Sequence, residues 1–162
     1  MIRLLYILIL LIPISIEAGK KSDLPLPRFA SIKSNEVNAR TGPSIKSPIE
    51  WVFVKKNEPV EIIAEYEQWR QIRDVKNDTG WVHSSVLSGK RSVIIIGQES
   101  KTITKKPVEK SKIIANIHPN VRCELKKCES DYCKIKCFSP ENKKYYSGFI
   151  QKKDIWGVYK NE

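Results

Sequence analysis

Short apolar runs separated by turn residues follow one another along most of the chain. From residue 29 to residue 90 these runs are broken at 41–44, 55–59 and 76–78 by Gly, Pro, Asn, Asp, Ser and Lys. The segment Trp69–Arg73 alternates with a period of two, which is typical of a strand with one buried face. No stretch has sustained helical periodicity. About five short strands in about 60 residues predict a small β-barrel.

The second half repeats this plan. The segments 80–89 and 148–157 both run from a glycine through an aromatic, a β-branched residue, a polar turn and a bulky aliphatic to a closing glycine. Residues 107–117 align with 43–53 without a gap, and five additional residues of the second half fall near 140–143, at a hairpin tip where no core is disturbed. The sequence therefore predicts an all-β chain of two small barrels, at 28–90 and 91–162. Because almost no linker separates them, we expect the barrels to pack against each other.

The N-terminus has the features of a signal peptide. A charged start is followed by an apolar run from Leu4 to Ile16 and by the small residue Ala18, after which we expect cleavage. An uncleaved anchor is the alternative, although the run is short for a membrane span. Residues 1–18 are thus predicted to direct export to the periplasm or cell envelope, with no stable membrane span after cleavage, and residues 19–27 to form a polar tether.

All four cysteines lie close together in the second half, at Cys123, Cys128, Cys133 and Cys137. An even number of cysteines in an exported domain favours disulfides, whereas zinc sites prefer closely paired cysteines in two separate knuckles. Four cysteines allow three pairings. If residues 130–131 form a hairpin tip, Cys128 faces Cys133, and Cys123 lies one step from opposition to Cys137. Nested bridges are then the simplest pairing.

Charge is unevenly distributed along the chain. The formal net charge is +11, of which residues 19–90 contribute +3 and residues 91–162 contribute +8. A basic domain favours anionic partners, but scattered lysines are also what a solvated surface looks like. We expect no nucleic-acid partner, because that function conflicts with export and because no exposed ladder of aromatic and basic residues is recognisable in the second half.

The first half resembles a bacterial SH3-like domain of the kind found on exported and cell-wall-associated proteins. The resemblance lies in Val37-Asn38-Ala39-Arg40-Thr41-Gly42-Pro43-Ser44, in Trp69-Arg70-Gln71-Ile72 and in the segment 80–89. The second half matches weakly, since Ile103-Thr104-Lys105-Lys106-Pro107 lacks the arginine and the glycine of the first motif. In the similar SH3 domains of signalling proteins a proline and a tyrosine help to build the groove for proline-rich peptides. Here His83 and Val86 take their places, so we do not expect such ligands.

Four residues are candidates for ligand binding. Arg40 could hold a carboxylate, and Trp51, Trp69 and Tyr66 could offer aromatic surface. The structural alternatives are that the aromatic side chains fill the core or rim of the barrel, and that Arg40 forms a structural salt bridge or binds carbonyls of its own loop. We place the site around Arg40 and Trp69 of the first barrel.

The sequence contains no recognisable catalytic constellation, metal-ligand spacing or phosphate-binding glycine loop, and we expect neither a cofactor nor enzymatic activity. The resemblance implies a non-catalytic binding module that recognises cell-wall peptide, such as peptidoglycan, or another envelope component. The alternatives are a protein-interaction module or an accessory subunit that docks on an envelope protein.

Overall fold

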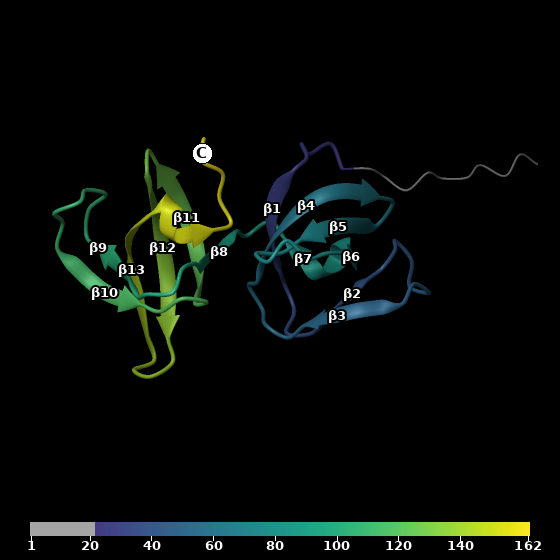
Figure 1. The fold of residues 1–162 in the computed structure, drawn as a ribbon, viewed down its shortest axis with the longest axis horizontal. Coiled ribbons are helices and arrows are strands. Elements are labelled where there is room, and N and C mark those ends of the chain that lie inside the picture. The colour runs from purple at the N-terminus through teal and green to yellow at the C-terminus, as the bar shows by residue number, and fades with distance from the viewer. Residues whose placement is uncertain (1–21) are drawn as a thin grey trace, which may run out of the picture.

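The computed structural model describes residues 22–162, which form two antiparallel β-sheets that lie side by side (Figure 1). Seven strands make up each sheet, in the orders β3-β2-β6-β5-β4-β1-β7 and β10-β9-β13-β12-β11-β8-β14. The predicted all-β fold class is confirmed. The predicted signal peptide at 1–18 lies outside the described residues. No helix within residues 22–162 has the length and apolar character needed to cross a bilayer.

The strands are short, as the sequence pattern predicts. The first sheet consists of β1 (Arg28–Ile32), β2 (Val37–Arg40), β3 (Ile49–Phe53), β4 (Pro59–Tyr66), β5 (Trp69–Arg73), β6 (Thr79–His83) and β7 (Leu87–Ser88). The second consists of β8 (Ser92–Ile95), β9 (Lys101–Thr104), β10 (Ile113–Ile117), β11 (Arg122–Glu129), β12 (Tyr132–Ser139), β13 (Lys144–Gln151) and β14 (Ile155–Trp156). The 3₁₀ turns η1 (Ser84–Val86) and η2 (Lys152–Asp154) precede the last strand of each sheet.

The two sheets have the same topology. Each strand of the second order carries a number seven higher than its counterpart in the first. The corresponding strands β3 and β10 also share one burial pattern, in which only the last residue is fully buried. The aligned glycines Gly80 and Gly148 both lie on the inner side of their sheets.

A small apolar core fills the first sheet. Ile72 of β5 and Val82 of β6 are completely buried, and they alternate with exposed or half-exposed residues along both strands. Gly80 is the register partner of Ile72, and the Trp51 ring packs over it. A larger residue would not fit at this position, because a Cβ would lie 2.8 Å from the indole Cη2 and 3.2 Å from the Cβ of Ala39. Trp51 packs against this core from its edge.

Both predicted disulfides are present in the second sheet. Cys123 bonds Cys137 and Cys128 bonds Cys133, so the bridges are nested across the β11–β12 hairpin. The sequence placed Cys123 one step from opposition to Cys137. Instead the two are direct register partners, because a bulge between Leu125 and Lys127 takes up the extra residue. Three of the four cysteines are buried among the aliphatic residues of the core, where they replace part of the apolar volume.

Polar contacts tie the two sheets together where β1 meets β8. Ser92 at the start of β8 donates its backbone N–H to the Ser31 Oγ at 2.9 Å and its hydroxyl to the Asn57 carbonyl at 2.7 Å. Both serines are buried. Arg122 of β11 reaches across to the carboxylate of Glu58 at 2.5 Å. This direct docking agrees with the expectation from the missing linker.

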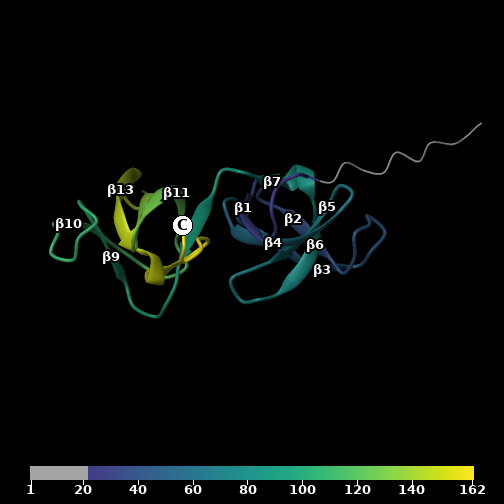
Figure 2. The ribbon, with the colours of Figure 1, turned by 90° about the horizontal axis from the view of Figure 1, so that it is seen from above.

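Aromatic contacts cover the other side of this junction. The ring of Phe29 lies 5.0 Å from that of Trp156, edge-on, and 4.7 Å from that of Tyr159. The Tyr159 hydroxyl donates to the Glu61 carboxylate at 2.8 Å, and burial together with this carboxylate raises the pKa of Tyr159 well above its usual range. The C-terminal end lies between the two sheets in both ribbon views (Figures 1 and 2).

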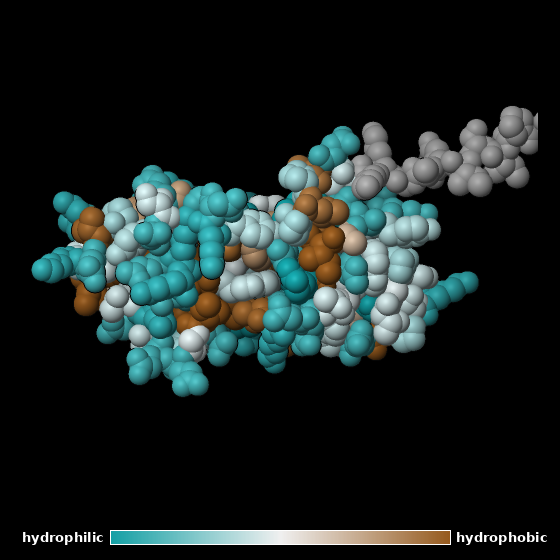
Figure 3. All heavy atoms as spheres, turned by 45° about the horizontal axis from the view of Figure 1, so that its top comes forward, coloured by the Kyte–Doolittle hydropathy of each residue, from teal (hydrophilic) through white to brown (hydrophobic). Residues whose placement is uncertain are grey.

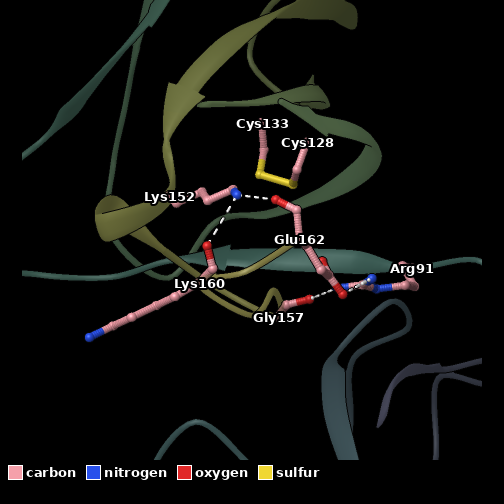
Figure 4. The surroundings of a disulfide bond; sticks show 7 residues. All are labelled: Arg91, Cys128, Cys133, Lys152, Gly157, Lys160 and Glu162. Atoms are coloured by element: carbon pink, nitrogen blue, oxygen red, sulfur yellow. Dashed lines mark hydrogen bonds and ion pairs between the residues drawn. A yellow bond between two sulfur atoms is a disulfide. The ribbon is translucent and has the colours of Figure 1, made fainter. Parts of the chain in front are cut away.

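The last residues of the chain are held beside the inner disulfide (Figure 4). Arg91 donates to the Glu162 carboxylate at 2.6 Å and to the Gly157 carbonyl at 2.5 Å. Lys152 donates to the Glu162 and Lys160 carbonyls. The segment that follows β14 is therefore attached both to the junction and to η2.

The described end of the predicted tether is anchored to the first sheet. Ser22 donates its backbone N–H and its hydroxyl to the Glu65 carboxylate, at 3.1 and 2.7 Å. Arg28 and Arg70 form ion pairs with the same carboxylate, which is almost completely buried. Burial raises the pKa of Glu65, but hydrogen bonds from Arg28 and Ser22 outweigh this effect, so the pKa is lowered.

Replacing Gly80 by alanine is expected to destabilise the first barrel by about 1–3 kcal/mol, because the new methyl group overlaps the Trp51 ring. Urea unfolding measures the change. The matched control is Gly89→Ala, since a Cβ at Gly89 meets no atom within 4 Å. Equal effects of the two substitutions would contradict the packing of Trp51 on Gly80.

The stability lost on removing each disulfide should depend on the length of the loop that the disulfide closes. The outer bridge spans 14 residues and the inner one 5. By chain entropy, Cys123→Ala with Cys137→Ala should lower the unfolding free energy by about 3 kcal/mol, and Cys128→Ala with Cys133→Ala by about 2 kcal/mol. Denaturant unfolding of the two double variants gives the values. A larger loss from the inner pair would argue against this account.

The Glu65 cluster predicts a loss of stability in acid. The folded-state pKa is lowered, so the carboxylate stabilises the fold above its unfolded-state pKa of about 4.3, and this contribution disappears as the pH falls through the folded-state value. The unfolding free energy of the parent protein should exceed that of Glu65→Gln at pH 6, and the difference should shrink in acid. A difference that is constant between about pH 2 and pH 6 would be inconsistent with the linkage.

Candidate functional site

A group of aromatic and basic side chains lies on the outer side of the first sheet. Register places Arg40 of β2 opposite Trp81 of β6, and Trp69 of β5 opposite His83 of β6. Tyr66 at the end of β4 is the register partner of Trp69. Directly opposed residues share a face of the sheet. These five residues are called the outer aromatic face below.

Arg40 is fixed by its own loop. Its Nη1 donates to the carbonyl of Ser47 at 2.8 Å, across the loop that joins β2 to β3. This is the structural alternative considered for Arg40, and it uses one of the five guanidinium N–H groups. The Arg40 side chain makes no other hydrogen bond or ion pair within residues 22–162. The half-exposed guanidinium is thus oriented and keeps donors for a carboxylate.

Trp69 and His83 contact each other at the other end of this face. The His83 ring meets the Trp69 ring edge-on, with centroids 5.6 Å apart. His83 also caps η1, since its Nδ1 accepts from the Ser85 backbone N–H at 3.3 Å. Tyr66 is 54% exposed beside them. Two rings held by neighbouring strands and one exposed phenol form a surface that needs little reordering to bind a ligand.

Trp51 does not belong to this group. It pairs with the fully buried Ala39 and packs over Gly80 on the inner side of the sheet. Its indole also meets the Phe53 ring edge-on at 6.0 Å. The structure therefore corrects the grouping of Trp51 with Arg40, because the pleat directs their side chains to opposite sides.

Trp81 and His83 are not among the four candidates selected from the sequence, although register places both on this face. The alternation Gly80-Trp81-Val82-His83 carries the signal, because an inward Val82 requires Trp81 and His83 to point outward.

The equivalent face of the second sheet has different chemistry. Thr104 stands opposite Phe149, where the first sheet has Arg40 and Trp81. Tyr132 stands opposite Gln151, whose Nε2 donates to the tyrosine hydroxyl at 3.2 Å. A groove of about 340 Å³ lies over these residues. Thr104 has no guanidinium, so this face lacks the oriented N–H donors that Arg40 provides in the first sheet.

No group of three His, Cys, Asp or Glu side chains within residues 22–162 is arranged to hold a metal ion. The two carboxylates whose pKa values are lowered, Glu65 and Glu124, each contact cations that form ion pairs with them. Neither belongs to the outer aromatic face. The chemistry that this face offers is hydrogen bonding, charge and aromatic surface.

Comparison with solved structures gives distant likenesses. NlpC1 from Trichomonas vaginalis matches at 13% identity with a TM-score of 0.35, over 88% of this chain and 50% of that one. An NlpC/P60 family protein from Bacillus cereus ATCC 10987 matches at 14% identity with a TM-score of 0.34, over 79% of this chain and 55% of that one. The chain thus spans about half the length of these proteins. Comparison with curated proteins gave no match.

A family model gives the specific match. Residues 33–89 match the model described as "Bacterial SH3 domain". The matched range runs from the end of β1 through β7 and includes all five residues of the outer aromatic face. It also contains the motif from Val37 to Ser44 and the closing segment 80–89 on which the resemblance was based. Residues 33–89 of this chain form a bacterial SH3 domain.

Proposed function

We propose that this chain is an exported, non-catalytic binding module whose first domain recognises cell-wall peptide through the outer aromatic face. A bacterial SH3 domain is a binding module, which supports the general class. The observation that carries the finer proposal is the juxtaposition of Arg40 with Trp81 on one face, with Trp69 and Tyr66 beside them.

The chemistry of this face fits a short peptide with a free carboxylate. The guanidinium of Arg40 is held by Ser47 and still offers paired N–H donors, which match the two oxygens of a carboxylate. Trp69 and Tyr66 provide rigid surface for the stem of a peptide side chain or backbone. Binding residues of this kind, aromatic and arginine, carry most of the energy of typical recognition surfaces.

Export is part of the proposal. All four cysteines are joined in two disulfides, which form and persist in oxidising compartments outside the cytoplasm. The sequence of residues 1–18 supplies the predicted signal peptide. We place the mature protein in the periplasm or cell envelope.

We also propose that residues 28–90 and 91–162 are two copies of one domain. The support is the shared strand order and the alignment of Ile113 with Ile49 and of Gly148 with Gly80. The second copy has replaced the arginine of the first motif by Thr104, so we assign the recognition of wall peptide to the first copy alone.

Docking on an envelope protein is the second candidate function, and the first sheet offers a place for it. Strand β3 lies at the edge of the sheet, and its residues Ile49 and Val52 are 49% and 40% exposed. An exposed edge with apolar side chains can accept a strand from a partner. Crosslinking in cells to one discrete protein, with no retention on purified peptidoglycan, would favour docking.

The wall-binding proposal predicts that Trp69→Ala weakens retention on purified peptidoglycan by at least about tenfold, the loss typical of a central aromatic contact. Sedimentation of the protein with peptidoglycan at physiological salt measures the dissociation constant. Val54→Ala is the control, because it removes an apolar side chain that is 70% exposed and lies outside the outer aromatic face. If both variants are retained like the parent protein, the outer aromatic face is not the site.

A further inference from the structure

We propose that the second domain binds an acidic polysaccharide in a lysine-lined groove on its outer face. The groove has a volume of about 570 Å³ and is lined by Lys105, Lys112, Ile113, Ile114, Lys134 and Phe149, together with two small residues of β13. None of the lining residues is acidic. Below it is called the lysine groove.

Three lysines converge on the groove from different parts of the chain. Lys105 follows β9 and Lys112 precedes β10, and the backbone N–H of Lys105 donates to the Lys112 carbonyl at 2.8 Å. Lys134 lies in β12, opposite Phe149 of β13. None of the three forms an ion pair within residues 22–162. No ion pair of the described residues therefore neutralises these ammonium groups, and all three are available to an anionic ligand.

The other walls of the groove are apolar. Ile113 and Ile114 are 56% and 38% exposed, and Phe149 is half-exposed with the Lys134 Nζ 5.9 Å from its ring centre. Such surfaces can pack against the C–H faces of sugar rings, while the ammonium groups contact acidic substituents at the ring edges. A space-filling view shows apolar residues surrounded by hydrophilic ones at the end of the molecule where β9 and β10 lie (Figure 3).

A row of basic and aromatic side chains continues from the groove along the β12–β13 ribbon. Lys136 lies two residues beyond Lys134, with its Nζ 4.4 Å above the Tyr145 ring. Phe138 continues the row, and its ring lies 5.0 Å from that of Tyr145. The exposed ladder of aromatic and basic residues that the sequence did not reveal is thus present. A row of this kind suits an extended polymer, since successive lysines on one face of a strand are about 7 Å apart.

The charge of the groove belongs to the second domain only. By the alignment of the two halves, the first domain has Thr41, Pro48 and Gln71 where the groove has Lys105, Lys112 and Lys134. It also has Glu50 in place of Ile114. The aligned positions of the first domain thus contain no lysine and one acidic residue. The fold itself therefore does not require the three lysines.

Three observations point to an acidic polysaccharide. The paired cysteines indicate an oxidising compartment, where glycans are available and nucleic acid is scarce. All cations of the groove are lysines, which act as point charges and do not fix one orientation of an anion, as suits repeated charges along a flexible polymer. The apolar residues line the same groove as the lysines, so C–H surface and positive charge lie side by side, as a sugar ring with an acidic substituent requires.

The test uses the full chain and polygalacturonate as a carboxylate-bearing polysaccharide, with uncharged dextran for comparison. Calorimetric titration should show binding of polygalacturonate that weakens as NaCl is raised from 50 to 200 mM, and no binding of dextran. The variant with Lys105→Thr, Lys112→Gln and Lys134→Gln should bind at least about tenfold more weakly. These lysines are exposed or half-exposed, so we expect the variant to unfold at the same temperature as the parent protein.

The control removes three positive charges from the first domain by Lys46→Gln, Lys55→Gln and Lys56→Gln, all at exposed positions. It should bind polygalacturonate within about twofold of the parent protein. An equal loss of affinity in both triple variants would mean that net charge alone causes the binding, and it would overturn the proposal.

Three further measurements test the class of ligand and the place of binding. Tighter binding of oligothymidylate or of phosphatidylglycerol vesicles than of polygalacturonate, lost in the groove variant, would overturn the assignment to polysaccharide. The double variant with Lys105→Thr and Lys134→Gln has the first-domain residues at these two positions. Its affinity for polygalacturonate should lie between those of the parent protein and the triple variant. Trp69→Ala should leave polysaccharide binding unchanged, which separates this site from the proposed wall-peptide site.

Discussion

The inward packing of Ile72 and Val82 is the constraint on which the proposed binding face depends. Both side chains are completely buried in the core of the first sheet. Because a strand alternates between its two faces, the same packing turns Trp69 and Trp81 to the outside. A shift of either strand by one residue would expose the core and bury the site. Fold and recognition surface are thus set by one register.

The two halves show how one scaffold can carry two surfaces. Their strand order is the same, and each core is closed by a short 3₁₀ turn and a final two-residue strand. The outer faces differ in chemistry, since Thr104 stands where the first half has Arg40 and Lys134 stands where it has Gln71. The buried bond between Ser31 and Ser92 helps to hold the two sheets together, so the two proposed binding surfaces belong to one unit.

Much of the fold could be predicted from the sequence, because strand period, turn residues and repeat spacing are local signals. The nested disulfides followed from the hairpin, although the bulge after Leu125 did not. The candidate site was only partly predictable. Register places Arg40 and Trp69 on one face, whereas Trp51 packs inside over Gly80. That packing depends on contacts between strands far apart in the sequence, which a local pattern does not reveal. The lysine groove was not visible either, since its members come from three separate segments.

The indole N–H signals of the four tryptophans offer the most direct test of the central claim. Trp69 and Trp81 lie on the outer aromatic face, Trp51 lies over Gly80, and Trp156 lies at the junction against Phe29. In two-dimensional NMR, added soluble wall peptide should shift the signals of Trp69 and Trp81 and leave those of Trp51 and Trp156 in place. Shifts confined to Trp51 or Trp156, or no shift of any of the four at saturating peptide, would contradict the account.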